Sequence, residues 1–407
     1  MNLFSVISAV AAPKSLWVTL INWVQSFVGN FGWTIILVTL FIKIVMTPLD
    51  FFVKLNSKKQ SLVQQKCAPQ ISKLQKKFGA DKNSFKIQSE AIYKREGLDM
   101  RSGCITMLVS TILSFVIFIT FYSDLRKVSS YEAIHEYEQI EATYTDAYYQ
   151  SLVENDPVKF DSKETAANWF VELNAINAKN EEDRTAEEQT ELQYWTDNQD
   201  TIFQKATDDA SKAASASWKQ LSKKSSWLWV QNIWVADSTT KMFPNYETLK
   251  SNAKNTGYTP YVTNNINAEQ YNKIATIITS SAPRQNNGFY ILAILAGVIT
   301  FASQYIAELH NKLKNKKASA LAQASCSATG SSMKMMKIIL PAIMVVFVLT
   351  ASASFGLYIL ASNLATILLG ELITLGVDKA TKTKRLEVEA ELEKEANKLI
   401  RKGKLKG

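Results

Sequence analysis

Five stretches of the chain are strongly apolar, and polar segments separate most of them; they cover residues 33–53, 104–122, 289–307, 336–351 and 355–377. Because about 20 apolar helical residues span a bilayer core of roughly 30 Å, each stretch predicts one transmembrane helix. Only Ala351-Ser352-Ala353-Ser354 separates the last two stretches, so we expect a tight reversal there. The pattern predicts an all-α polytopic membrane protein with a five-span helical bundle. With their flanks, the spans are 33–53, 104–122, 288–308, 336–351 and 352–377.

Residues 1–32 predict an amphipathic helix that lies in the membrane interface. Trp17 and Trp23 suit the headgroup level, and Gly29-Asn30-Phe31-Gly32 ends the helix before the first span. An extra, poorly formed span is the alternative. The start of the chain is apolar but short and has no basic region, so we do not expect a cleaved signal peptide. The apolar face consists of Leu16, Leu20, Ile21, Val24, Phe27 and Val28.

Residues 54–103 predict a basic helical hairpin, because residues 54–102 hold 12 Lys and Arg against 4 Asp and Glu. Apolar residues recur at helical spacing on both sides of Gly79-Ala80-Asp81, where we expect the turn. Residues 123–287 are acidic instead, with 16 basic against 24 acidic residues between 123 and 286.

The acidic region contains two insertions of different composition. The first, 129–224, is rich in Glu, Asp, Lys, Ala and Gln and predicts helices. The second, 238–286, is rich in Asn, Thr, Tyr and Ser and contains Pro244, Gly257 and Pro260, so we expect loops and short irregular elements. The whole region is thus predicted to be mostly helical.

The distribution of charge predicts the topology. Residues 309–337 hold 6 basic and no acidic residues, and the tail 378–407 holds 10 basic against 6 acidic residues. Lys and Arg accumulate on the cytoplasmic side of spans. This places the hairpin 54–103, the loop 309–335 and the tail 378–407 inside, and 123–287 outside. We expect a multi-pass plasma-membrane protein with its N-terminus outside and its C-terminus in the cytoplasm. Binding of the basic tail to ribosomal RNA is an alternative reason for its charge.

The residues with reactive or metal-binding side chains are sparse. Cys67, Cys104 and Cys326 fall in or beside predicted cytoplasmic segments, so we expect reduced thiols. His135 and His310 lie far apart in polar segments. No Ser/His/Asp constellation, phosphate loop or metal spacing is found, and we therefore predict no enzyme, no cofactor and no metal site.

Lys43 is the residue that points to function, because it lies about ten residues inside the first span. A Lys at the centre of a bilayer costs roughly 2.5–3.5 kcal/mol, so it usually faces a bundle interior or a water-filled cavity. Thr39, Lys43 and Thr47 lie four residues apart, and Asp50 follows three later, which predicts one polar stripe along the helix. We expect Asp50 to pair with a nearby Lys such as Lys54.

Two other spans carry similar weakly polar faces. Together with the stripe of the first span they predict an intramembrane hydrophilic groove, although Ser and Thr also serve as ordinary contacts between helices. The predicted groove residues are Thr39, Lys43, Thr47, Thr106, Ser110, Ser114, Ser362, Asn363 and Thr366.

Several of these segments resemble the YidC-type membrane protein insertase family of bacteria, mitochondria and chloroplasts. Gly29-Asn30-Phe31-Gly32-Trp33, followed by Lys43 and Thr47-Pro48-Leu49, is similar to the family's first core span with its buried basic residue. The hairpin and the remaining spans show further likenesses. These are Pro69-Gln70-Ile71, Ile92 to Gly97, Gly103-Cys104, Trp227-Leu228-Trp229-Val230, Ala236-Asp237, Tyr290-Ile291-Leu292, Gly297-Val298, Pro341, Gly356-Leu357-Tyr358 and Ser362-Asn363-Leu364.

The resemblance implies a non-enzymatic insertase and chaperone. Its groove opens to the cytoplasm and to lipid, takes up a hydrophilic segment of a nascent membrane protein, and releases the flanking apolar segment into the bilayer. The implied partners are nascent membrane proteins and lipid, with the ribosome and the Sec translocon as further candidates, and no DNA. The insertions imply contacts with lipid or protein. Bacterial members usually have Arg where this chain has Lys43.

Two other functions are compatible with parts of the pattern. An anion channel or transporter-like protein would use Lys43 as its ion site, although no inverted repeat is found. A membrane-anchored extracellular sensor would use the two insertions. A flux assay tests the first alternative, and deletion of 129–224 tests the second.

Overall fold

The computed structural model describes residues 10–78, 81–97, 100–315 and 330–401. In these ranges the regular secondary structure is helical, and β-pairing is limited to two isolated bridges. The chain forms two units. The outer unit contains residues 1–35, 121–292 and 348–357, and the span unit contains 36–120, 293–347 and 358–407. The predicted all-α class is confirmed for the described residues.

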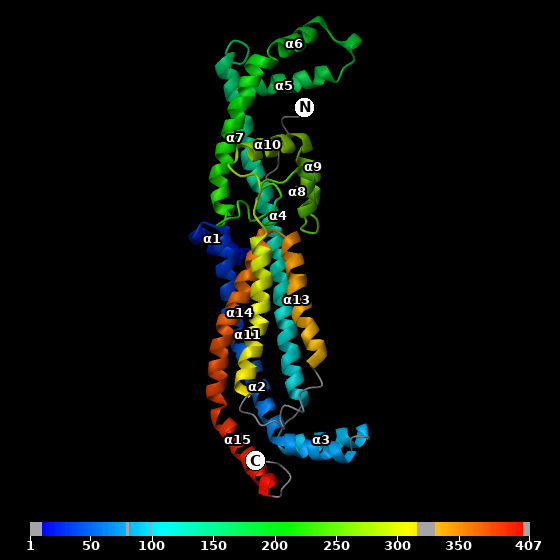
Figure 1. Ribbon diagram of the computed structural model, residues 1–407. Coiled ribbons are helices and arrows are strands. Elements are labelled where there is room, and N and C mark those ends of the chain that lie inside the picture. Colours follow the sequence, from blue (N-terminus) through cyan, green and yellow to red (C-terminus); the bar gives the residue numbers. More distant parts are fainter. Residues whose placement is uncertain (1–9, 79–80, 98–99, 316–329, 402–407) are drawn as a thin grey trace. The chain divides into compact units, whose positions relative to one another are not determined.

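The span unit contains most of the apolar helices and the basic segment predicted to form a hairpin (Figure 1). Two long helices, α2 (Phe31–Phe78) and α4 (Met100–Asn155), each contribute to both units. α3 (Lys82–Arg95) follows α2, and Asp81 caps its first turn by accepting bonds from the Asn83 and Ser84 amides. The unit also includes most of α11 (Ile291–Asn315), α13 (Gly330–Thr350) and α14 (Ala353–Ala380), together with α15 (Lys382–Arg401).

Three of the described helices are long and apolar enough to cross a membrane, namely those beginning at Phe31, Leu108 and Ala353. Shorter apolar helices cover Leu16–Val28, Ile291–Ile306 and Pro341–Thr350. The chain is therefore a helical protein of membrane type, and the count of five spans stays a prediction. Parts of the predicted loop 309–335, Cys326, the turn residues 79–80 and the end of the tail lie outside the described residues.

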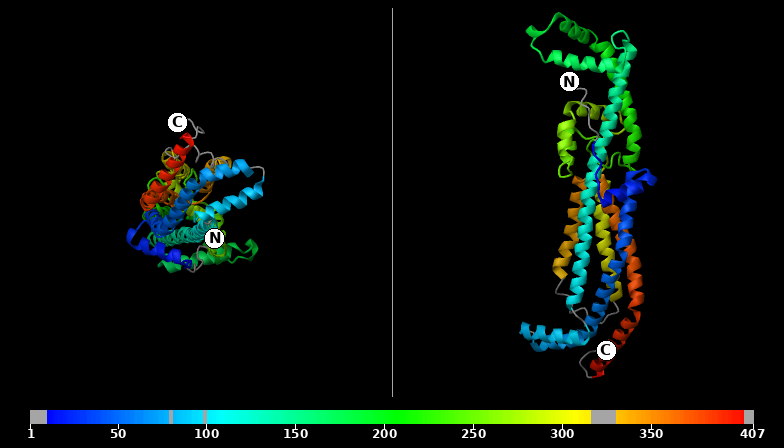
Figure 2. Two further views of the ribbon diagram at one scale, coloured as in Figure 1. Left: turned by 90° about the horizontal axis from the view of Figure 1, so that it is seen from below. Right: turned by 180° about the vertical axis from the view of Figure 1, so that it is seen from behind.

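The outer unit contains α1 and the acidic region (Figure 2). Helix α1 (Leu16–Val28) begins at Ser15, whose hydroxyl donates to Asp124 of α4 at 2.5 Å. One side of α1 is buried, whereas Leu16, Trp23 and Phe27 remain 76, 64 and 62% exposed. The remaining helices of the region are α5 (Lys163–Asn177), η1 (Glu181–Asp183), α6 (Ala186–Asp197), η2 (Gln199–Phe203), α7 (Gln204–Ser225), α8 (Tyr246–Asn252), α9 (Thr259–Asn265) and α10 (Ala268–Ser281).

The expectation of irregular structure in 238–286 is wrong. Three helices form there, and α10 buries Tyr271, Ile274 and Ile278 on one face. This spacing matches the helical period, and the core of the outer unit stabilises a helix that the composition of Asn, Thr and Ser does not favour. Asn245 and Asn267 accept amide bonds at the first turns of α8 and α10, so part of the Asn content serves as helix caps.

A tryptophan-rich segment, residues 226–237, joins the outer parts of several apolar helices within the outer unit. Its Val235 and Ile233 carbonyls accept bonds from the Ala353 and Ser354 amides at 2.9 and 2.8 Å, at the start of α14. Trp234 packs against Phe31 of α2 with ring centroids 5.0 Å apart. We call this segment the outer strap, because it connects the beginnings of α2 and α14.

Asp237, at the end of the outer strap, caps the beginning of α11. Its carboxylate accepts bonds from the Phe289 amide at 2.8 Å, the Leu292 amide at 2.6 Å and the Trp229 indole at 3.3 Å. The side chain is only 2% exposed. A Cβ added to Gly288 would lie 1.7 Å from its carboxylate oxygen, so only glycine fits beside this cap.

Two glutamates of α4 line a cavity of about 560 Å³ in the outer unit. Glu136 is 6% exposed and accepts a bond from the Trp234 indole at 3.3 Å. Burial raises the pKa of Glu136 to about 8 and that of Glu132 to about 7. Lys224 of α7 lines the same cavity and partly opposes both shifts.

The raised pKa values predict that the outer unit loses stability as the pH rises. The folded state holds protons that the unfolded chain, with an ordinary pKa of 4.5, has already released, so the free energy of unfolding falls between about pH 4.5 and 8. We expect a loss of about 2 kcal/mol, well below the upper bound of about 5 kcal/mol for an unrelaxed shift of this size. Glu136→Gln should reduce this slope, with the contribution of Glu132 remaining, whereas Glu172→Gln, at an exposed site, should leave the slope unchanged. Thermal unfolding in nanodiscs at pH 5 and pH 8, followed by tryptophan fluorescence, measures the difference, and equal slopes for all three proteins would contradict it.

Candidate substrate groove

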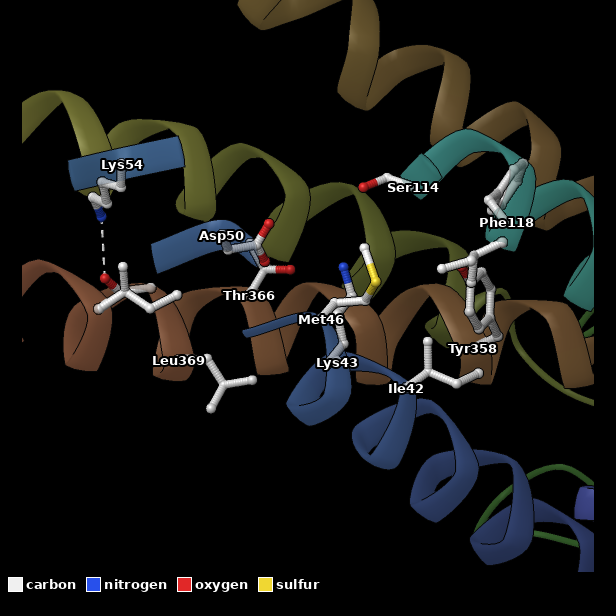
Figure 3. Close-up of a pocket in the computed structure, with 13 residues that line it drawn as sticks. Ile42, Lys43, Met46, Asp50, Lys54, Ser114, Phe118, Tyr358, Thr366 and Leu369 are labelled. Atoms are coloured by element: carbon white, nitrogen blue, oxygen red, sulfur yellow. Dashed lines mark hydrogen bonds between the residues drawn. The ribbon is translucent and has the colours of Figure 1, made fainter. Parts of the chain in front are cut away.

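The span unit contains a cavity of about 360 Å³ that Lys43 faces (Figure 3). Its walls come from α2, α4 and α14, the helices that hold the first, second and fifth predicted spans. It is lined by Ile42, Lys43, Met46, Asp50, Lys54, Ser114, Ile117, Phe118, Tyr358, Thr366, Leu369, Gly370 and Ile373. A cavity of this size holds several water molecules or a short stretch of polypeptide.

Lys43 is half-buried, and its neighbours Ile42 and Met46 on α2 are apolar. The helical period explains its direction, because Met46, Asp50 and Lys54 lie three, seven and eleven residues beyond it and line the same cavity. Ile44 and Val45, between them, are 58 and 60% exposed on another face of the helix. Of the polar stripe predicted for the first span, Lys43 and Asp50 therefore line the cavity, whereas Thr39 and Thr47 do not.

Ser114 and Thr366 bring hydroxyl groups to the cavity from two other helices. Both side chains are exposed, and both turn their oxygens toward the space that Lys43 enters (Figure 3). The Thr366 hydroxyl also donates to the Ser362 carbonyl at 2.8 Å. Thus the structure brings together Lys43, Ser114 and Thr366 of the nine predicted groove residues.

The other predicted groove residues do not line this cavity. Thr39 and Ser110 are buried, with 1 and 8% exposure. The Thr47 hydroxyl donates to the Lys43 carbonyl at 2.9 Å, within α2. Thr106 and Ser362 are both half-buried, and Thr106 interacts with another group of the protein.

Asn363 has a role in helix packing. Its side-chain amide donates to the Thr300 hydroxyl of α11 at 2.7 Å, and Thr300 donates in turn to the Ala296 carbonyl at 2.6 Å. This bond joins α14 to α11 across 63 residues of sequence. Asn363 thus matches the helix-contact alternative that the sequence left open for such residues.

The expected ion pair between Asp50 and Lys54 is not formed. The Lys54 ammonium donates instead to the Gly370 carbonyl at 3.1 Å and to the Thr374 hydroxyl, both on α14. Asp50 is exposed at the cavity wall. The reason is geometric, because the long Lys54 side chain reaches acceptors on the neighbouring helix that the sequence spacing within α2 does not reveal.

Ten cavity-lining residues were not among the predicted groove residues: Ile42, Met46, Asp50, Lys54, Ile117, Phe118, Tyr358, Leu369, Gly370 and Ile373. Extending the polar stripe by four residues beyond Asp50 would have found Lys54, whereas the apolar residues carry no such signal. Phe118 and Tyr358 pack together with ring centroids 5.9 Å apart and close one side of the cavity. Aromatic residues in an apolar span carry no sequence signal that separates such a wall from lipid contact.

The cavity offers the ammonium groups of Lys43 and Lys54, the carboxylate of Asp50 and the hydroxyls of Ser114 and Thr366 among apolar side chains. Such a site attracts anionic and polar groups and offsets part of their desolvation cost. Among the described residues, no group of three His, Cys, Asp or Glu side chains lies close enough to hold a metal ion. The charged and hydroxyl groups of the lining make the cavity suited to binding polar groups of a ligand or peptide.

Comparison with known proteins confirms the family resemblance. The family described as 60Kd inner membrane protein matches residues 23–178. The membrane protein insertase YidC of Wolinella succinogenes is 28% identical over 104 residues, which are 26% of this chain and 19% of that protein. That of Fusobacterium nucleatum is 32% identical over 99 residues, which are 24% of this chain and 46% of that protein. That of Aromatoleum aromaticum is 30% identical over 116 residues, 28% of this chain and 19% of that protein. No solved structure matches the chain.

Proposed function

We propose that this relative of the YidC-type insertases is itself a membrane protein insertase that works without chemical catalysis. The observation that carries the proposal is the cationic side chain of Lys43 in a cavity with the hydroxyls of Ser114 and Thr366, inside otherwise apolar helices. The matched segments span between a fifth and a half of the relatives' lengths, so the activity of the whole protein is part of this proposal.

In the proposed mechanism, a hydrophilic segment of a nascent membrane protein enters the groove from the cytoplasm. Lys43 attracts its acidic or polar groups, while Ser114 and Thr366 replace hydrogen bonds that these groups lose with water. The flanking apolar segment then moves into lipid past exposed apolar side chains, where its burial is favourable. Ile44 and Leu372 are examples of such side chains, with 58 and 64% exposure.

The groove is proposed to be closed toward the outside. This closure is what the resemblance to the insertase family implies. We further propose the N-terminus outside, the C-terminus in the cytoplasm, nascent membrane proteins as substrates, and the ribosome and a Sec translocon as partners.

Site-specific photocrosslinking tests the proposed function. A photoreactive residue at Ser114 or at Thr366 should crosslink to the hydrophilic segment of a ribosome-stalled, single-span nascent chain. The same residue at Leu372, which is exposed on another face of α14, should favour the apolar segment of the substrate. If neither groove position crosslinks to the nascent chain, while flux of anions through liposomes depends on Lys43, the channel alternative replaces the insertase.

A further inference from the structure

The C-terminal helix α15 makes specific contacts with the cytoplasmic part of α2 in the span unit (Figure 2). Lys66 forms an ion pair with Glu391 at 3.2 Å, and Lys73 forms one with Glu395 at 3.8 Å. The two contacts advance in the same direction along both helices. Two separate ion pairs therefore fix where α15 contacts this part of α2.

Lys66 connects three helices with one ammonium group. Besides Glu391 of α15, it pairs at 2.9 Å with Glu96, the residue that ends α3. The hydrogen bond with Glu96 raises the pKa of Lys66, and the same bond lowers the pKa of Glu96. The hairpin is thus joined to the tail through a side chain that also joins the two hairpin helices.

One apolar side chain of α15 is also buried. Val388 is 4% exposed although its neighbours Glu387 and Glu389 are exposed. Inside the hairpin, Val63 and Cys67 of α2 pack with Ile92 and Tyr93 of α3. The burial of Val388 shows that α15 packs against the protein through an apolar side chain as well as through charge pairs.

The charges of the two partners are complementary. Acidic residues occupy every second position of α15 from Glu387 to Glu395, whereas residues 54–102 hold 12 basic against 4 acidic residues. The ion pairs of Lys66 and Lys73 with α15 are solvent-exposed. Exposed pairs are weak individually and are screened by salt, so a contact built from them is reversible.

We propose that α15 is a reversible electrostatic latch on the cytoplasmic hairpin. In the closed latch, Glu391 forms an ion pair with Lys66 and Glu395 forms one with Lys73. With the latch closed, these lysines are covered by the protein's own tail. With the latch open, they are available to an acidic partner, and α15 separates from α2. The latch adds a regulated state to the hairpin and does not depend on how the groove of Lys43 works.

Distance measurement between two spin labels tests the latch in the full-length protein in nanodiscs. The labels replace the exposed residues Gln64 of α2 and Ala390 of α15 in a cysteine-free background. We expect one narrow distance at about 50 mM salt, where exposed charges interact over a longer range, and at least a twofold loss of that population at about 500 mM salt. Glu391→Lys/Glu395→Lys should cause the same loss at low salt.

Two further variants separate the latch from a general effect of charge. Lys73→Glu combined with Glu395→Lys reverses one pair and should restore the narrow population relative to Glu395→Lys alone. Glu393→Lys, at an exposed position of the same helix, should leave the population within the error of the wild type. An unchanged distance in the Glu391→Lys/Glu395→Lys variant at both salt concentrations overturns the proposal, as does equal opening by Glu393→Lys.

Discussion

Lys43→Ala is expected to reduce insertion of single-span substrates with acidic outside tails at least tenfold, whereas Lys43→Arg should retain most of the activity. At an effective dielectric constant of about 20, opposite charges 4 Å apart attract each other by roughly 4 kcal/mol. Losing even half of this attraction lowers the population of the loaded groove more than tenfold, since about 1.4 kcal/mol corresponds to a factor of ten. Arg keeps the charge and so preserves the attraction.

The measurement compares membrane insertion of acidic-tailed and neutral-tailed substrates in a strain depleted of its own insertase. The matched control is Lys54→Ala, which removes another ammonium at the same cavity, one that is already bonded to Gly370 and Thr374. We expect a smaller loss for Lys54→Ala, without dependence on the charge of the substrate tail. Full complementation by Lys43→Ala would show that the positive charge is not required, although it would leave the family resemblance intact.

Asp237→Ala is expected to destabilise the outer unit by about 3 kcal/mol or more. The substitution leaves two amides at the start of α11 and the Trp229 indole without their acceptor in a buried site. Each unsatisfied buried donor costs about 1–3 kcal/mol, and relaxation with entry of water reduces the sum. Unfolding by denaturant in nanodiscs, followed by tryptophan fluorescence, measures the loss.

Two controls make this result specific to the cap. Asp237→Asn keeps one side-chain acceptor and should lose less than Asp237→Ala. Gly288→Ala should also destabilise the wild type, because its Cβ would lie 1.7 Å from the Asp237 carboxylate, and it should cost much less in the Asp237→Ala background. The carboxylate does not hold the start of α11 if the free energies of unfolding lost by Asp237→Ala and Gly288→Ala add in the double variant. An unchanged denaturation midpoint for Asp237→Ala would lead to the same conclusion.

The sequence by itself was sufficient for the all-α class and for selecting Lys43, which lines the cavity. Lys43 is identifiable without coordinates because an ammonium group in an apolar span is costly unless a cavity or partner receives it. The same cost explains why the charged residues Lys43, Asp50 and Lys54 of α2 line the cavity. The start of α3 was also readable, because Asp81 of the predicted turn caps this helix locally.

The tertiary structure decided which weakly polar residues meet. Ser114 and Thr366 share the cavity with Lys43, whereas Asn363 bonds to Thr300 and Lys54 reaches Gly370, although all of them carry similar signals in the sequence. It also decided that Ala268–Ser281 is a helix, since the burial of Tyr271 and Ile274 outweighs the local preference for irregular structure. The physical reason is the same in each case. Hydroxyl, amide and apolar groups gain only small free energies from their own helix, so their partners on other helices determine where they lie, whereas a charge in an apolar span is constrained by its solvation alone.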